Sequence, residues 1–159
     1  MFGRGGEEAI GLAAAGIPFR IIPGVTAGLG ALAAAAIPAT LRGINRAIVF
    51  ATGHGAEDDA FDWTPLARTG QPIVLYMVMH NLARIADALM RGGLPAATPV
   101  AVIVSATMAE ERILLSTLEH VAADVRAQAF EPPAIIVVGD IVAVRGRLLA
   151  GAVADEGAR

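Results

Sequence analysis

Residues 21–41, with the sequence IIPGVTAGLGALAAAAIPATL, constrain the fold most, because they join a turn to a helix without one charged side chain. Pro23 ends the apolar run before it, and Gly24 has no Cβ to crowd a tight turn. Thr26 occupies the position of a helix N-cap, so a helix should begin directly after it with free N–H groups at its first turn. The small side chains that follow suit either tight packing on a sheet or a small-molecule site.

Apolar runs alternate with helical patterns along most of the chain. Runs bounded by turn residues predict strands, and apolar residues three or four positions apart predict helices. The predicted strands are residues 19–22, 46–51, 72–77, 99–104, 112–116 and 133–138. Besides the helix after Thr26, the predicted helices are residues 7–15, 81–91 and 118–127, with a short one near residues 61–67. We therefore expect an α/β fold, a mixed, mostly parallel sheet flanked by helices.

The charged residues limit the kinds of partner. The net charge of −3 argues against nucleic-acid binding, which normally needs a basic face. All 12 basic residues are arginines, whose planar guanidinium groups suit carboxylates and phosphates. The chain has no cysteine, so it can form neither a disulfide nor a thiolate site. Hydrophobic residues make up 55% of the chain, which suggests apolar surface reserved for a partner, either a missing part of the chain or a second subunit.

The location of the protein is predicted from two features. The N-terminal residues MFGRGGEEA lack the pattern of a signal peptide. Pro23 and Pro38 interrupt the long uncharged stretch, which predicts a buried helix rather than a membrane span. We expect a cytoplasmic protein that does not bind a membrane.

The loops after the predicted strands are the candidate ligand sites, because ligands of open α/β sheets collect beyond the carboxyl ends of strands. These loops are residues 23–27, 52–55, 77–80 and 105–108, with the approach to Pro133. The three histidines, His54, His80 and His120, have no metal-ligand spacing, so no metal site is expected. Met77 and Met79 follow an apolar strand and could fill the core or form a soft wall for an apolar or sulfur-bearing ligand.

Several motifs in one order resemble the uroporphyrinogen-III C-methyltransferases, a branch of the tetrapyrrole methylase family. The motifs are FGRGGEE at residues 2–8, GIPFRIIPGVTA at 16–27, IPATLR at 37–42, TGH at 52–54, DW at 62–63, YM at 76–77, TPVAVI at 98–103 and PPAIIVVGDIV at 132–142. The resemblance implies the fold of the family's C-terminal domain. It also implies C-methylation of uroporphyrinogen III to precorrin-2, on the way to sirohaem and cobalamin, with S-adenosylmethionine as donor and S-adenosylhomocysteine as product.

The resemblance also implies which residues bind the cofactor. The expected contacts, mostly through backbone atoms, come from Thr26, Ala27, Met77, Ala106 and Ala134. Adenine and ribose need a shallow apolar slot with a few main-chain donors and acceptors, and these small residues could form one.

Charged residues at matching motif positions imply roles toward the substrate. Arg4 and Arg42 are expected to bind the tetrapyrrole, whose eight carboxylates suit guanidinium groups. Glu7, with Arg4, is the expected catalytic residue, removing a proton as the methylated pyrrole rearomatises. Two departures from the family pattern are Val78, expected to add bulk beside the cofactor, and Glu111, which would add negative charge near the substrate if it faced inward.

The expected organisation has three parts. Residues 1–20 resemble the end of an N-terminal domain and an inter-domain helix, residues 21–150 the C-terminal domain, and residues 151–159 a flexible tail. The family's proposed acid and base, an Asp and a Lys, belong to the first domain and have no counterpart here. The family is dimeric, so a homodimer is expected. The chain is expected to be a truncated form of the enzyme that is inactive by itself. The alternatives are a non-catalytic dimerising fragment and a methylase of a related precorrin.

Overall fold

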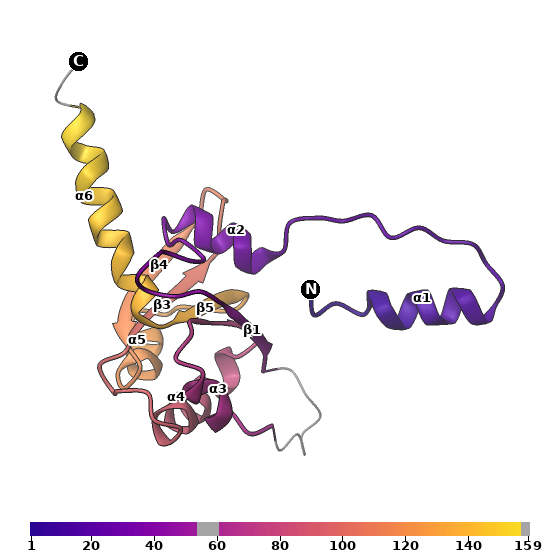
Figure 1. The fold of residues 1–159 in the computed structure, drawn as a ribbon, viewed down its shortest axis with the longest axis horizontal. Helices are drawn as coiled ribbons and strands as arrows, with labels where there is room; N and C mark the ends of the chain where they lie inside the picture. The colour runs from indigo at the N-terminus through magenta and orange to yellow at the C-terminus, as the bar shows by residue number, and fades with distance from the viewer. Residues whose placement is uncertain (54–60, 157–159) are drawn as a thin grey trace.

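A single sheet forms the centre of the molecule (Figure 1). The computed structural model describes residues 1–53 and 61–156, and within them five strands pair in the order β1-β2-β5-β3-β4. The strands are β1 (Val49–Thr52), β2 (Ile73–Tyr76), β3 (Pro99–Val104), β4 (Arg112–Thr117) and β5 (Ala134–Val138). Each coincides within three residues with a predicted strand.

The helices other than α6 also follow the sequence pattern. The helices are α1 (Gly5–Ala14), α2 (Ala27–Ala34), α3 (Thr64–Arg68), α4 (Leu82–Arg91), α5 (Val121–Ala127) and α6 (Val144–Glu156), with short 3-10 turns η1 (Met79–Asn81) and η2 (Asp140–Ala143). Helix α2 starts directly after Thr26, as predicted. Helix α6 continues to Glu156, into the segment expected to be a flexible tail. None of the helices in the described residues is long and apolar enough to span a membrane.

The α/β class and the mixed sheet are confirmed, but the expectation of a mostly parallel sheet is wrong. Only β1 and β2 pair in parallel; β2–β5, β3–β5 and β3–β4 are antiparallel among the strands described. Strand β5 lies between β2 and β3, so these two strands run in the same direction without pairing with each other. The strand–helix–strand pattern of β2, α4 and β3 correctly predicted that β2 and β3 run in the same direction. The sequence of β5 does not indicate that this strand inserts between them.

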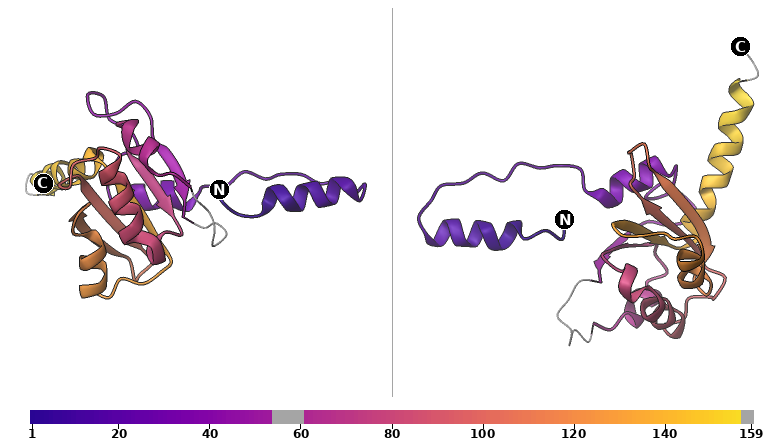
Figure 2. Two further views of the ribbon diagram at one scale, coloured as in Figure 1. Left: turned by 90° about the horizontal axis from the view of Figure 1, so that it is seen from below. Right: turned by 180° about the vertical axis from the view of Figure 1, so that it is seen from behind.

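Helices cover the sheet on both faces (Figure 2). Successive residues of a strand point to opposite faces. Val100 and Val102 of β3 accordingly pack with α4 and α5, whereas Ala101 and Ile103 pack with α2. The central strands are buried on both sides, which explains their continuous apolar sequences although their ladders are antiparallel.

We call residues 1–25 the N-terminal arm. The arm begins near the sheet, where Phe2 contacts Tyr76, extends away through α1 and returns to the sheet at α2 (Figure 1). Helix α1 buries none of its residues, and Ile21 and Val25 are 78% and 84% exposed. The strand predicted at residues 19–22 is absent, so that prediction is wrong. The segment is apolar enough for a strand, but a strand forms only against a neighbouring edge, and no described strand pairs with it.

The buried sheet leads to a first prediction. Leu75 in β2 is fully buried between the sheet and the helices of one face, so Leu75→Ala leaves a cavity and should lower the free energy of unfolding by about 2–5 kcal/mol. Urea denaturation monitored by circular dichroism measures this change. Leu115→Ala in β4 is the matched control, because Leu115 is 53% exposed and its loss should cost less than about 0.5 kcal/mol. Equal losses in both variants would contradict the described core.

Candidate functional site

The antiparallel entry of β5 brings three loops to one edge of the sheet. Tyr76, the last residue of β2, lies opposite Ile135, and Val104, the last residue of β3, lies opposite Ala134. The amino end of β5 therefore meets the carboxyl ends of β2 and β3. The first turn of α2 lies at the same edge, and together these segments line an open cavity of about 530 Å³.

The five residues expected to bind a cofactor all line this cavity, which we call the α2 cavity. They are Thr26, Ala27, Met77, Ala106 and Ala134. They come from four separate segments of the chain, so their meeting is a property of the fold and not of their positions in the sequence. No charged side chain is among the residues that line the cavity in the described structure. The α2 cavity therefore suits an uncharged, largely apolar group.

The hydroxyl group of Tyr76 forms hydrogen bonds with residues at the start of α2. The backbone N–H of Gly28 donates to the Tyr76 hydroxyl at 2.6 Å, and the Thr26 hydroxyl lies 2.7 Å from the same oxygen. Thr26 occupies the N-cap position, but its side chain makes no capping bond. Within the residues that the structure describes, the backbone N–H of Ala27 has no partner and remains available as a donor.

Strained backbone is concentrated at this cavity. Met77, Ser105 and Thr107 have φ angles of 54°, 50° and 69°, in the left-handed region of backbone conformation that residues other than glycine rarely adopt. Each costs on the order of 1–3 kcal/mol and persists only where surrounding contacts enforce it. One such contact is the carboxylate of Glu111, which accepts the Thr107 N–H at 2.7 Å. Glu111 therefore supports the loop that carries Ala106.

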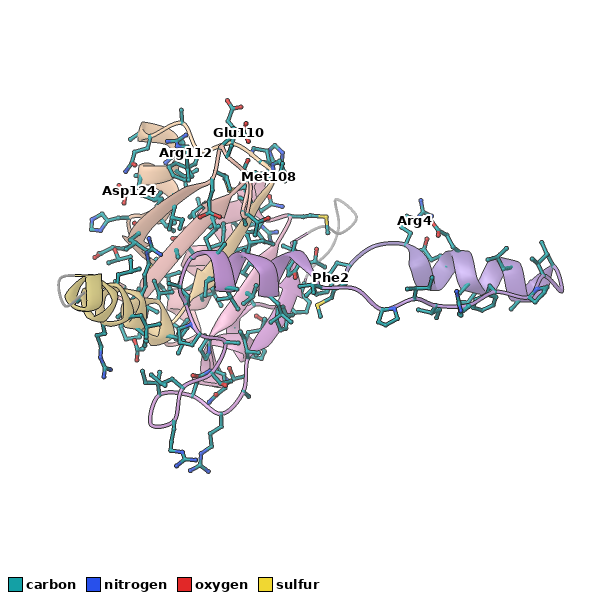
Figure 3. The ribbon with its side chains drawn as sticks, turned by 90° about the horizontal axis from the view of Figure 1, so that it is seen from above. Phe2, Arg4, Met108, Glu110, Arg112 and Asp124 are labelled. Carbon is teal, nitrogen blue, oxygen red and sulfur yellow. The ribbon has the colours of Figure 1, made fainter. Side chains whose placement is uncertain are left out.

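Arg4 and Glu7 lie on the N-terminal arm and not in the α2 cavity. They line a second cavity of about 360 Å³ together with Phe2 and Met77, so Met77 lies between the two cavities. The Arg4 guanidinium donates to the Glu7 carboxylate at 2.6 Å, and both side chains are mostly exposed. Figure 3 shows Phe2 against the body of the molecule and Arg4 further out, near α1.

Arg42 is exposed and does not line the α2 cavity. It lies on a loop organised by Asn45, whose side chain is 7% exposed. The Asn45 amide donates to the carbonyl oxygens of Ala39 and Ala47, both at 2.9 Å, and accepts the N–H of Leu41 at 3.0 Å. The structure therefore fixes the backbone beside Arg42 and leaves its guanidinium accessible.

Two other expected features differ from the structure or are not described. Val78 does not add bulk beside the α2 cavity; it is fully buried in the core of the opposite face, where its side chain fills the space next to Gly53. His54 lies outside the described residues. His80 lines a separate cavity of about 400 Å³ with Met77 and Met79. No three potential metal ligands gather anywhere in the described part of the chain.

Tyr76 is the residue of the candidate site that the sequence reasoning missed. It is the chain's one tyrosine and ends an apolar strand, and its partner Gly28 lies in a helix of small residues. A Cβ at position 28 would overlap the tyrosine hydroxyl, so the glycine is required by this contact. A single polar ring at a strand end, with a glycine at the start of a nearby helix, was the available signal.

Known tetrapyrrole methylases are similar to this chain. The family model described as Tetrapyrrole (Corrin/Porphyrin) Methylases matches residues 1–122. A uroporphyrinogen-III C-methyltransferase of Sinorhizobium sp is 44% identical over 151 residues, which cover 93% of this chain. A siroheme synthase of Gluconacetobacter diazotrophicus is 43% identical over 144 residues, or 89% of the chain.

A solved structure also matches. The crystal structure of uroporphyrin-III C-methyl transferase from Thermus thermophilus complexed with S-adenyl homocysteine superposes with a TM-score of 0.76 and 31% identity, covering 91% of this chain and 63% of that one. The chain spans 54% of the Sinorhizobium protein and 31% of the Gluconacetobacter protein. The similarity therefore concerns about half, or less, of those curated relatives.

The Asn45 loop leads to a second prediction. Asn45→Ala removes three hydrogen bonds from a buried position and should lower the free energy of unfolding by about 1–3 kcal/mol, with faster hydrogen exchange at the Leu41 amide. Chemical denaturation and amide exchange measure the two effects. The control is Asn81→Ala, because Asn81 is exposed and makes no side-chain capping bond. Unchanged exchange at Leu41 would show that Asn45 does not hold the loop.

Proposed function

Because the chain belongs to the tetrapyrrole methylase family, we propose that its α2 cavity binds S-adenosylmethionine and that the chain serves C-methylation of uroporphyrinogen III to precorrin-2. One observation carries the proposal: Thr26, Ala27, Met77, Ala106 and Ala134, chosen from motifs scattered over the sequence, line one cavity. The pathway would be sirohaem or cobalamin biosynthesis in the cytoplasm.

The α2 cavity fits the proposed ligand in size and chemistry. Its volume of about 530 Å³ lies within the usual range for small-molecule sites. The open N–H of Ala27 supplies a main-chain donor, and the half-exposed thioether of Met77 supplies a soft, polarisable wall. No cationic side chain lines the cavity in the described structure, so nothing there repels a positively charged sulfonium.

The mechanism assigns this chain mainly binding and positioning. When bound, S-adenosylmethionine supplies an electrophilic methyl group, and the protein's task is to align the acceptor carbon with it. Arg4 and Arg42 would hold carboxylates of the tetrapyrrole, and Glu7 would accept the proton that leaves the ring. Arg4 and Glu7 lie beside Met77, which connects their cavity with the α2 cavity. The proposal involves no metal ion, because alignment and proton removal suffice.

The proposal extends to the organisation of the protein. Residues 1–20 would pack against another domain, and residues 21–150 would form the domain that holds the cofactor. Helix α1 buries none of its residues, and its Ile10 is 71% exposed. This supports the division, because packing against another domain would cover these apolar side chains. A homodimer would cover further apolar surface.

The alternative is a dimerising module that binds the cofactor without transferring a methyl group. It is favoured by the position of Arg4 and Glu7, which pair with each other on an exposed arm. Incubation of the chain with labelled S-adenosylmethionine and either uroporphyrinogen III or a precorrin distinguishes the possibilities. Label in uroporphyrinogen III supports the enzyme, label only in a precorrin changes the acceptor, and cofactor binding without transfer supports the module.

A third prediction tests cofactor binding. Calorimetry should show saturable binding of S-adenosylhomocysteine to the chain, and Met77→Asp should abolish it by placing a charge at an apolar wall. Aspartate tolerates the left-handed backbone at this position, so the substitution adds little strain. Met108→Asp is the control, because Met108 is 62% exposed and does not line the cavity. Equal binding by Met77→Asp and the wild type would contradict the proposed site.

A fourth prediction tests Arg42. Arg42→Ala should weaken binding of uroporphyrin III, a stable molecule with the substrate's carboxylates, by about tenfold through loss of one charge-assisted hydrogen bond. Its affinity for S-adenosylhomocysteine should stay within about twofold of wild type, because Arg42 does not line the α2 cavity. Fluorescence quenching and calorimetry measure the two affinities. Arg126→Ala on α5 makes the same charge change on the opposite face of the sheet and should alter neither. Equal weakening of both ligands by Arg42→Ala would reject the assigned role.

A further inference from the structure

Tyr76 is the polar group most deeply placed at the α2 cavity, with a residual exposure of 7%. Its hydroxyl oxygen has two neighbours, the N–H of Gly28 at 2.6 Å and the hydroxyl of Thr26 at 2.7 Å. The backbone N–H of Gly28 can only donate, so the tyrosine oxygen accepts this hydrogen bond. The direction of the remaining bond, between the two hydroxyl groups, decides what Thr26 can offer to a ligand.

The direction of that bond follows from the cost of an unpaired buried donor. If Thr26 donated to Tyr76, the phenol oxygen would accept two bonds and its own proton would be left without an acceptor in a buried position. If Tyr76 donates to Thr26, every buried donor is paired. The Thr26 proton is then free, and Thr26 is only partly buried and lines the α2 cavity. The tyrosine thus makes Thr26 a donor toward the cavity.

The lining of the α2 cavity indicates which part of a ligand this donor meets. S-adenosylmethionine has a charged amino-acid end and an uncharged nucleoside end. The described lining contains no charged side chain that could pair with an ammonium or a carboxylate. It consists of small and apolar residues with a few hydroxyl and main-chain groups, which suits adenine and ribose.

We propose that Tyr76 is a positioning residue that holds Thr26 as a hydrogen-bond donor to the nucleoside part of S-adenosylmethionine. This inference rests on the proposed function. Tyr76 donates its one hydroxyl proton to Thr26, so it has no proton left to donate to the ligand. Gly28 is also required for this positioning, because any side chain there would displace the tyrosine hydroxyl.

The test compares variants of the two hydroxyl groups by calorimetry with two probes, S-adenosylhomocysteine and 5′-methylthioadenosine, which lacks the amino-acid end. Tyr76→Phe keeps the ring, and with it the contact to Phe2 at 5.0 Å, and removes only the hydroxyl. It should weaken both probes by about tenfold, because one ligand hydrogen bond is lost. Thr26→Val should weaken both to the same extent, whereas Thr26→Ser, which keeps the hydroxyl, should bind like wild type.

The double variant and a control separate this role from a general loss of stability. Tyr76→Phe combined with Thr26→Val should bind no more weakly than either single variant, because both remove the same ligand bond. Thr98→Val is the control: it removes a buried hydroxyl bond of 2.6 Å to the Pro95 carbonyl, away from the cavity lining. Its affinities should stay within about twofold of wild type even where thermal unfolding shows a similar loss of stability.

Three results would overturn the inference. Wild-type affinity of Tyr76→Phe for both probes would remove the tyrosine from the site, and weakening of S-adenosylhomocysteine alone would place the donor at the amino-acid end. If the loss of affinity in the double variant equalled the product of the losses in the two single variants, the two residues would act independently. If the wild-type chain bound neither probe, the proposed function would fail together with this inference.

Discussion

The position of β5 between β2 and β3 is the constraint on which the rest of the structure depends. Because β5 runs antiparallel to both neighbours, its first residues meet their last residues at one edge of the sheet. A strand in the parallel direction would place Ala134 at the opposite edge, far from Met77 and Ala106. The same arrangement buries the central strands on both faces, so the edge that carries the α2 cavity is built on a rigid base.

The α2 cavity combines this rigid base with a helix that is anchored at both ends. The Tyr76 hydroxyl binds the first turn of α2, and the Arg145 guanidinium donates to the Ala35 carbonyl at its last turn, where a positive charge is favourable. Strained residues at the ends of β2 and β3 indicate that loop shape at the cavity is maintained at a cost in stability. Charged groups lie elsewhere, on the N-terminal arm and the Asn45 loop. The arrangement separates a cavity without charged lining residues, our proposed nucleoside site, from the cationic groups that we propose bind an acidic ring.

Much of the fold could be predicted because burial on both faces leaves a strong local signal. The apolar runs at β2, β3 and β5 and the helical spacing of α4 are such signals. Strand order was not predictable, because apolar side chains on both faces of β5 do not specify which neighbours it pairs with. The prediction of a strand at residues 19–22 was wrong for a related reason. An apolar sequence indicates that a segment could form a strand, but it does not show whether a neighbouring strand is present to pair with it. At the site, family motifs identified small residues, whereas Tyr76 was missed because its role depends on a partner 48 positions away.

The central claim is that the loops at this edge of the sheet form a nucleoside site, and a crystal structure of the chain grown with S-adenosylhomocysteine tests it most directly. The account predicts adenine and ribose in the α2 cavity between Ala27 and Ala106, with the Met77 side chain within about 4 Å of the ligand. A ligand bound only in the cavity beside His80, with the α2 cavity holding solvent, would contradict it.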